Sequence, residues 1–188
     1  TSRLTNNGFM KNIFNQLRLR AGFAKLKQEL KMFKRKKNHS VSLKDAQNIG
    51  ILVPIKNEKE YAEAEQFAKT LQTDNKRVKL LGFIFDKELK NKFKGRLELI
   101  SVDDINWNYI PDKEKIKSFV NNEFDILINL CTDLCFPLVY VAAVSKSVFK
   151  IAAYDPQQMP FFDFMIETEQ ESITGFSKEI RYYLDKIK

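Results

Sequence analysis

The chain has 188 residues, of which 44% are hydrophobic and 30% are charged. This length suits one globular domain with an additional segment, and the apolar content excludes a disordered chain. Two cysteines are too few for a scaffold built on disulfides. A mean hydropathy of −0.38, without an apolar run of about 18 residues, indicates no transmembrane helix.

The positive charge is concentrated at the N-terminus, although the whole chain carries a formal net charge of +8. Residues 1–45 hold 12 basic and two acidic side chains, which gives this segment a net charge of +10. Residues 46–188 hold the other 20 basic and 22 acidic side chains, a net charge of −2. We therefore divide the chain into a basic helical arm with its linker, residues 1–45, and an α/β domain, residues 46–188.

The arm is predicted to be helical from Phe9 to Lys37, because good helix formers dominate this stretch and proline is absent. Its apolar residues form two faces. The first face holds Ile13, Phe14, Leu17, Ala21 and Ala24, and the second holds Leu19, Phe23, Leu26, Leu30 and Phe33. We expect a kink, or a break into two helices, at Gly22, where the faces exchange.

The body is predicted to alternate buried strands with helices. Strands are expected over residues 49–53, 78–85, 97–101, 124–130, 148–152 and 161–166, and helices over residues 58–71, 113–121, 136–145 and 172–187. Such alternation is typical of βαβ units. We therefore predict an α/β fold with a single Rossmann-like or flavodoxin-like, mainly parallel sheet flanked by helices, preceded by the basic helical N-terminal arm.

In sheets of this type, ligands bind beyond the carboxyl ends of the strands. The candidate ligand residues there are Asn129, Thr132, Asp133 and Asp155. No glycine follows the first strand, and neither G-x-G-x-x-G nor a Walker A motif occurs, so a dinucleotide site is not expected. Asp133 has two interpretations, as a catalytic group or as a cap of the next helix. We predict no catalytic residue and no cofactor, but an enzyme that binds a sugar nucleotide or another small molecule stays open as an alternative.

The two cysteines, Cys131 and Cys135, are four residues apart. A metal site would need further ligands, and the only histidine, His39, lies in the linker, so no metal is predicted. The spacing also differs from the C-x-x-C of redox motifs. We interpret both residues as reduced, buried thiols, which fits a cytoplasmic location.

Two further pairs each have a chemical and a structural interpretation. Asp103 and Asp104 are adjacent carboxylates, which favours a solvated loop or a capping role over acid–base catalysis, because neighbours on an extended chain point to opposite faces. Trp107 and Tyr109 either stack on a base or sugar, or cover the edge of the core.

The basic arm carries the strongest functional signal. Its candidate nucleic-acid-binding residues are Arg18, Arg20, Lys25, Lys27, Lys31, Lys34, Arg35, Lys36 and Lys37. A helix rich in Lys and Arg neutralises phosphates, which predicts a cytoplasmic, non-enzymatic protein that binds RNA or an RNA–protein particle such as the ribosome, with the body as a docking platform. Two alternatives stay open: an anionic membrane surface, and a structural helix packed on the body or on a second copy of the chain in a homo-oligomer.

Two resemblances rest on particular segments. Residues 49–53, Asn106-Trp107-Asn108, residues 124–130 and residues 143–150 together resemble a family of small proteins of unknown function from Bacteroidetes-type bacteria, which also carry a basic N-terminal helix. This resemblance implies no activity and no site residue. The segment from Phe124 to Lys150 is also similar to one strand–helix–strand unit of heptosyltransferase-like glycosyltransferases, and we interpret that likeness as a shared βαβ unit without shared catalysis.

Overall fold

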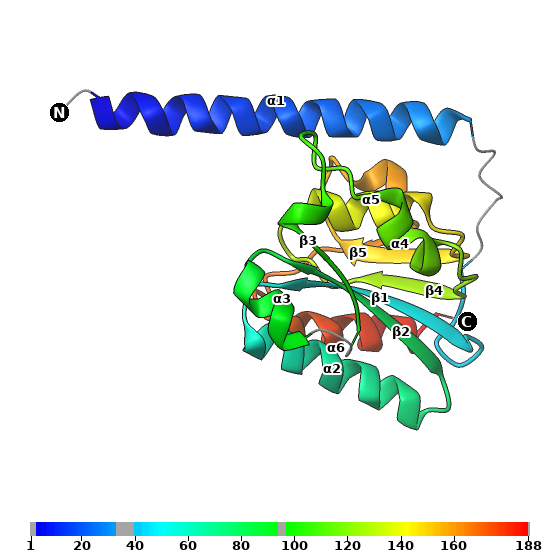
Figure 1. Ribbon diagram of the computed structural model, residues 1–188. Coiled ribbons are helices and arrows are strands. Elements are labelled where there is room, and N and C mark those ends of the chain that lie inside the picture. Colours follow the sequence, from blue (N-terminus) through cyan, green and yellow to red (C-terminus); the bar gives the residue numbers. More distant parts are fainter. Residues whose placement is uncertain (1–2, 33–39, 94–96, 188) are drawn as a thin grey trace.

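Figure 1 shows the computed structural model of the chain, which describes residues 3–32, 40–93 and 97–187, with the backbone alone for residues 3–12. The helices are α1 (Arg3–Lys31), α2 (Glu58–Thr73), α3 (Lys87–Phe93), α4 (Lys113–Val120), α5 (Phe136–Val144) and α6 (Ile173–Leu184). The strands are β1 (Asn48–Ile55), β2 (Arg77–Ile84), β3 (Glu98–Ser101), β4 (Ile126–Asn129), β5 (Phe149–Ala153) and β6 (Phe164–Ile166). Two short 3-10 helices are η1 (Val102–Asp104) and η2 (Met159–Phe161).

The six strands form one sheet in the order β3-β2-β1-β4-β5-β6, and every neighbouring pair is parallel. The predicted α/β class with a parallel sheet is therefore confirmed. Of the two expected arrangements, this is the Rossmann order and differs from the flavodoxin order. The direction in which strands are added reverses between β1 and β4, which marks the switch point where ligands bind in such sheets.

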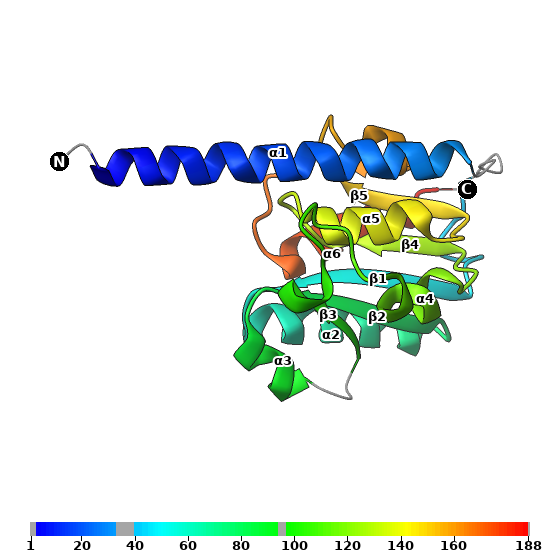
Figure 2. The same cartoon turned by 45° about the horizontal axis from the view of Figure 1, so that its top comes forward.

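Helices cover both faces of the sheet, as the views in Figure 1 and Figure 2 show. One core cluster joins the sheet to α2, α3 and α6, and the other joins it to α4 and α5. The long helix α1 lies across α5 on the outside of that second layer. The arm therefore adds a further layer on one side of the body.

Strand β1 lies in the middle of the sheet, and seven of its eight residues are buried. We expected this strand to end before Pro54, but it continues to Ile55. Pairing with β4 covers only Ile49–Leu52, so Pro54 lies beyond that ladder and its missing N–H costs no bond to β4. Tertiary pairing with β2 keeps the backbone extended past the proline.

Two other elements and one cap differ from the sequence prediction. Helix α3 was not predicted; Asp86 starts it by accepting a hydrogen bond from the Glu88 N–H at 2.9 Å. The expected strand over residues 161–166 is shortened to β6, because η2 occupies the preceding residues. The prediction that Asp133 caps a helix is wrong, because α5 begins at Phe136 and Cys135 is its N-cap residue.

Among residues 3–32, 40–93 and 97–187, no helix combines the length and the apolar composition needed to cross a bilayer.

Candidate functional site

The arm is a single straight helix in the structure, so the kink or break predicted at Gly22 is wrong. Its 29 residues span about 43 Å at 1.5 Å per residue. Gly22 instead marks the closest approach to the body: a Cβ built there would lie 2.5 Å from the carbonyl oxygen of Asn108 and 2.7 Å from the ring of Phe136. The glycine therefore lets two surfaces touch, and the helix keeps one direction.

The second predicted apolar face of the arm is the one that docks. Leu26 is fully buried, and Leu19 and Leu30 pack against the same core cluster. The Phe23 ring lies edge-to-face with Phe136, with centroids 4.7 Å apart, and stacks on Phe161 at 6.0 Å. Burial of these side chains removes apolar area from water and holds α1 on α5.

Polar contacts fix the rotation of the docked helix. Glu29, the only acidic residue of α1, accepts a hydrogen bond from the Tyr140 hydroxyl at 2.7 Å and pairs with Lys113 at 3.3 Å. Burial and then the hydrogen bond to Glu29 raise the pKa of Tyr140. Asn15 accepts a further hydrogen bond from the Tyr109 hydroxyl at 3.1 Å. The helix therefore turns its single negative charge towards the body.

Arg18, a candidate nucleic-acid contact, also reaches the body. Its Nε–H donates to the carbonyl oxygen of Trp107, and its guanidinium lies 4.2 Å from the centre of the Tyr109 ring. The guanidinium also lies 5.8 Å from the centre of the Phe14 ring. Arg18 thus joins the arm to the loop formed by residues 105–111.

The other basic residues of the arm that the structure describes face solvent. The exposed ones are Arg20, Lys25, Lys27 and Lys31, and none of them forms an ion pair with another described residue. Lys34, Arg35, Lys36 and Lys37, together with His39, lie outside the described residues. Since Glu29 faces the body, the solvent side of the described arm carries positive charge alone.

Lysines of the body are placed differently. Within the described residues, eight of them pair with a carboxylate of the body itself. Seven of these pairs have distances from 2.6 to 3.8 Å and involve Lys56, Lys59, Lys69, Lys79, Lys87, Lys90 and Lys117, and the eighth joins Lys92 to Glu58. Such exposed pairs add little stability, but each pair cancels its local charge. Many lysines of the body are thus neutralised, whereas Arg77, Lys115, Lys146 and Lys178 are exposed without an ion pair to another described residue, as the cations of the arm are.

The strand ends at the switch point bring together part of the predicted ligand set. Asn129 ends β4, Thr132 and Asp133 lie in the connection from β4 to α5, and Lys56 after the end of β1 pairs with Asp133 at 3.3 Å. Asn129 is fully buried; its Oδ1 accepts from the Cys131 N–H at 3.3 Å, while its Nδ2 has no hydrogen-bond partner among the described residues. This unpaired amide could donate a hydrogen bond to a ligand oxygen.

Two other observations limit what this edge can bind. The Asn57 side chain accepts from the Glu60 N–H at 3.0 Å, and Glu60 in turn accepts from the Lys56 N–H at 2.7 Å, so the N-terminus of α2 is closed by its own carboxylate. A phosphate there would meet that negative charge. Asp155, at the end of β5, is engaged with Gln157 and Gln158 of its own turn at 2.8 and 2.9 Å. Its carboxylate is therefore held by its own turn.

Cys131 and Cys135 are free thiols buried in the core cluster between the sheet and α5. Burial and then a hydrogen bond with Cys135 raise the pKa of Cys131 well above its usual range. A protonated thiol in apolar surroundings is a poor nucleophile and a poor metal ligand. Across the described residues, no three His, Cys, Asp or Glu side chains group as a metal site would require.

Of the acidic pair, Asp104 has a capping role. Asp104 accepts from the Ser101 N–H at 2.9 Å and from Lys90 at 2.9 Å, which ties η1 to α3. Burial opposes ionisation, yet the hydrogen bonds from Lys90 and Ser101 hold the pKa of Asp104 below its usual value. Asp103 pairs with Lys87 at 2.7 Å and points elsewhere. The two carboxylates do not converge on a cleft.

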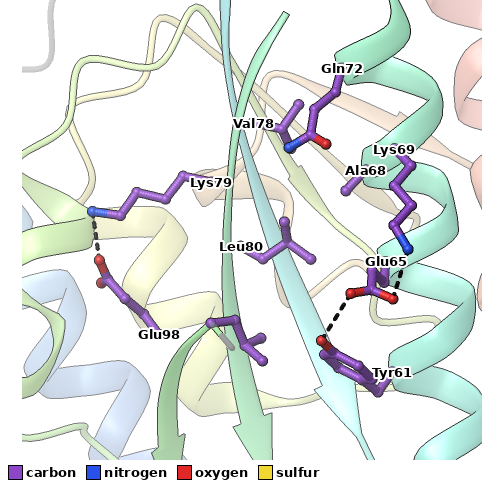
Figure 3. A pocket seen from close by; sticks show the side chains of 10 residues that line it. Tyr61, Glu65, Ala68, Lys69, Gln72, Val78, Lys79, Leu80 and Glu98 are labelled. Carbon is purple, nitrogen blue, oxygen red and sulfur yellow. Dashed lines mark hydrogen bonds and ion pairs between the residues drawn. The ribbon is translucent and has the colours of Figure 1, made fainter. Parts of the chain in front are cut away.

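A groove of about 380 Å³ lies between α2 and the β2–β3 edge of the sheet (Figure 3). Val78, Leu80 and Leu97 line it with apolar surface. Lys69 pairs with Glu65 at 3.1 Å, and Lys79 pairs with Glu98 at 2.6 Å. Both lysines of the lining are thus neutralised, so the described residues that line the groove offer no unpaired cation to an anionic ligand.

Sequence reasoning missed the residues that orient the arm. Glu29 and Tyr140 were not singled out, although one acid in an otherwise basic helix is a signal that its side chain faces inward. The contacts of Arg18 with Trp107 and Tyr109 had no local signal in the sequence, because Arg18 and Trp107 are 89 residues apart. Of the two interpretations of the aromatic pair, Tyr109 is half-buried against the arm, whereas Trp107 stays exposed.

Comparison with known proteins assigns the chain to a family. A search of the curated proteins gives no match. Residues 19–187 match a family of unknown function (DUF6913). The match begins within α1, so it includes the docked half of the arm as well as the whole sheet. Since it spans most of the chain, the protein belongs to the DUF6913 family.

Proposed function

We propose that this protein is a non-enzymatic binding protein whose basic arm contacts RNA or an RNA–protein particle such as the ribosome, with the α/β body as its docking platform. The observation that carries the proposal is the charge of the arm: Arg20, Lys25, Lys27 and Lys31 are exposed without a carboxylate partner in the described chain. Unpaired cations on a rigid helix attract a polyanion, because each phosphate contact releases condensed counterions.

Two further features belong to the proposal. The protein acts in the cytoplasm, where RNA and ribosomes are present and where the two free thiols stay reduced. The basic helix is a property of a Bacteroidetes-type family. In support, the family match starts at residue 19, and the arm is basic beyond that point.

The test measures binding of the full chain to a single-stranded RNA across a series of salt concentrations. The test variant replaces Lys25, Lys27 and Lys31 by Gln together. For single strands, the slope of log K against log salt changes by about 0.7 for each phosphate contact, so the triple variant should bind more weakly and lose about 2 from its slope. An unchanged affinity and slope would contradict a role for the arm.

A matched control removes the same charge from the body. The control variant replaces Lys59, Lys69 and Lys117 by Gln, and these exposed lysines all pair with a glutamate of their own helix. The two variants have the same net charge, so a difference between them reports the position of the charge and not its total. We expect the control to bind RNA as the parent chain does.

A second candidate function is the binding of a small molecule, such as a sugar nucleotide, at the switch point. It is favoured by the buried, unpaired Nδ2 of Asn129 close to the Lys56–Asp133 pair. The closed N-terminus of α2 counts against a phosphate group. Thermal unfolding of the full chain with a panel of nucleotides and sugars tests this candidate, and a rise in Tm that Asn129→Ser abolishes would support it.

A further inference from the structure

Exposed aromatic rings gather where the arm meets the body. Phe14 of α1 is 60% exposed, and Trp107 of the 105–111 loop is 64% exposed. Arg18 connects them, because its guanidinium lies over the Tyr109 ring, near the Phe14 ring, and donates to the Trp107 carbonyl. We call Phe14, Arg18, Trp107 and Tyr109 the aromatic cluster.

The loop that carries Trp107 is held in a defined shape. The Asn106 side chain accepts hydrogen bonds from the N–H groups of Asn108 and Ile110 at 3.2 and 3.0 Å, and Ile105 pairs with Pro111 at the base of the loop. Tyr109 adopts a left-handed backbone, with φ of 63°, which a non-glycine residue keeps only under local constraint. Trp107 is thus exposed at the tip of a fixed loop.

The exposed cations of the arm lie on the same helix as Phe14 and Arg18. Arg20 follows Phe14 by six residues on the same helix and is exposed, as are Lys25 and Lys27. Flat rings next to unpaired cations are the combination that binds single-stranded nucleic acid: bases stack on the rings, and phosphates contact the cations. In a duplex the base faces are already stacked on one another, so the rings would have nothing to hold.

We propose that the aromatic cluster makes this arm a binder of single-stranded RNA, with unpaired bases stacking on Trp107 and Phe14. This inference rests on the proposed function and names its substrate class. Arg18 acts as a positioning residue that joins the helix to the loop. The cationic residues supply affinity that depends on salt, and the two rings supply affinity that does not.

Trp107 provides its own reporter, because it is the only tryptophan in the chain. The full chain is titrated with an oligouridylate of about 10 nucleotides, a length within the site sizes of single-strand binders, and with an RNA duplex of the same strand length. We expect the single strand to change the tryptophan fluorescence and to bind more tightly than the duplex. Equal affinity for the duplex, without a fluorescence change, would overturn the inference.

Two substitutions separate stacking from charge. Trp107→Leu and Phe14→Leu keep an apolar side chain but remove the ring, and binding is then followed by the anisotropy of a labelled oligouridylate. One lost base–ring stack should weaken binding roughly 5- to 150-fold without changing the salt slope. Tyr182→Leu, which removes an exposed ring from α6, is the matched control and should bind as the parent does. Thermal unfolding verifies that each variant folds.

The outcomes distinguish this inference from the function on which it rests. If the parent binds RNA with a clear salt dependence and both leucine variants bind equally well, stacking is refuted and the basic arm is retained. If the parent binds neither RNA, both proposals fail. If it instead binds vesicles of phosphatidylcholine and phosphatidylserine, with a blue shift of Trp107 and no response to oligouridylate, the cluster is a membrane contact and both proposals are again overturned.

Discussion

Replacing Gly22 by alanine tests whether α1 is packed on the body or stands free in solution, because the two situations predict opposite signs. On the body, the added Cβ meets the Asn108 carbonyl at 2.5 Å and the Phe136 ring at 2.7 Å. Backbone cannot move aside as a flexible side chain can, and overpacking of this kind costs about 1–3 kcal/mol. Alanine recovers about 1 kcal/mol of helix propensity over glycine. We expect a net loss of about 1 kcal/mol.

The assay is amide hydrogen exchange of residues 19–30 under native conditions, which measures the free energy of opening the docked helix. A loss of about 1 kcal/mol corresponds to a roughly fivefold larger open population. Ala24→Gly is the matched control, because Ala24 is exposed on the same helix and its replacement should cost about 1 kcal/mol of helix propensity alone. Gly22→Leu, with a larger side chain, should open the helix further than Gly22→Ala does.

Slower exchange in Gly22→Ala would refute the packing of α1 on α5. A free helix gains stability from alanine, so the opening free energy would rise by about 1 kcal/mol. The Ala24→Gly control must still lose stability in that case, since helix propensity acts on free and docked helices alike.

Three further predictions concern titratable groups that hold the arm and the β3 edge. Glu29→Gln weakens the hydrogen bond from Tyr140 and should lower the free energy of unfolding in urea by about 1 kcal/mol. Because the pKa of Tyr140 is raised, the folded chain keeps the hydroxyl proton to a higher pH than the unfolded chain does. The stability that this proton contributes is present below a pH of about 10 and should be lost as the pH rises further. A series of Tm values at alkaline pH should show this loss, and the loss should be smaller in Glu29→Gln. Burial opposes ionisation of Asp104, but its hydrogen bonds with Lys90 and Ser101 lower its pKa. The contribution of Asp104 to the stability of the fold is therefore present above a pH of about 4 and is lost in acid. In Asp104→Asn, the Tm should fall less steeply over this acid range.

The sequence determined the sheet and its class through patterns that are local. Buried strands such as β1 and β4 are short apolar runs, and the amphipathic helices between them show the helical repeat. A chain of this length can bury such strands on both faces only in a parallel sheet covered by helices. The elements missed or shortened, α3 and β6, are seven and three residues long, too short for a periodic pattern to appear.

The sequence also predicted that the arm has two apolar faces, but the role of each face became evident only from the packing of α1 on the body. The face with Leu26 is buried on α5, whereas Phe14 and Leu17 of the other face stay exposed. Periodicity marks a face as apolar without saying what covers it. Which face is covered depends on the shape of the body, and above all on the close approach of α1 to the body that Gly22 permits.

For the candidate site, too, some features follow from the sequence and others only from the fold. The positive charge of the arm follows from the sequence alone, since charge is a property of composition. The tertiary structure decided which of its cations face solvent, drew Arg18 onto Tyr109 and turned Glu29 inward. It also brought Phe14 and Trp107 to the same junction of arm and loop. These contacts join segments about 90 residues apart in the chain, and only the packing of α1 on the completed body brings them together, because no local pattern encodes contacts between such distant segments.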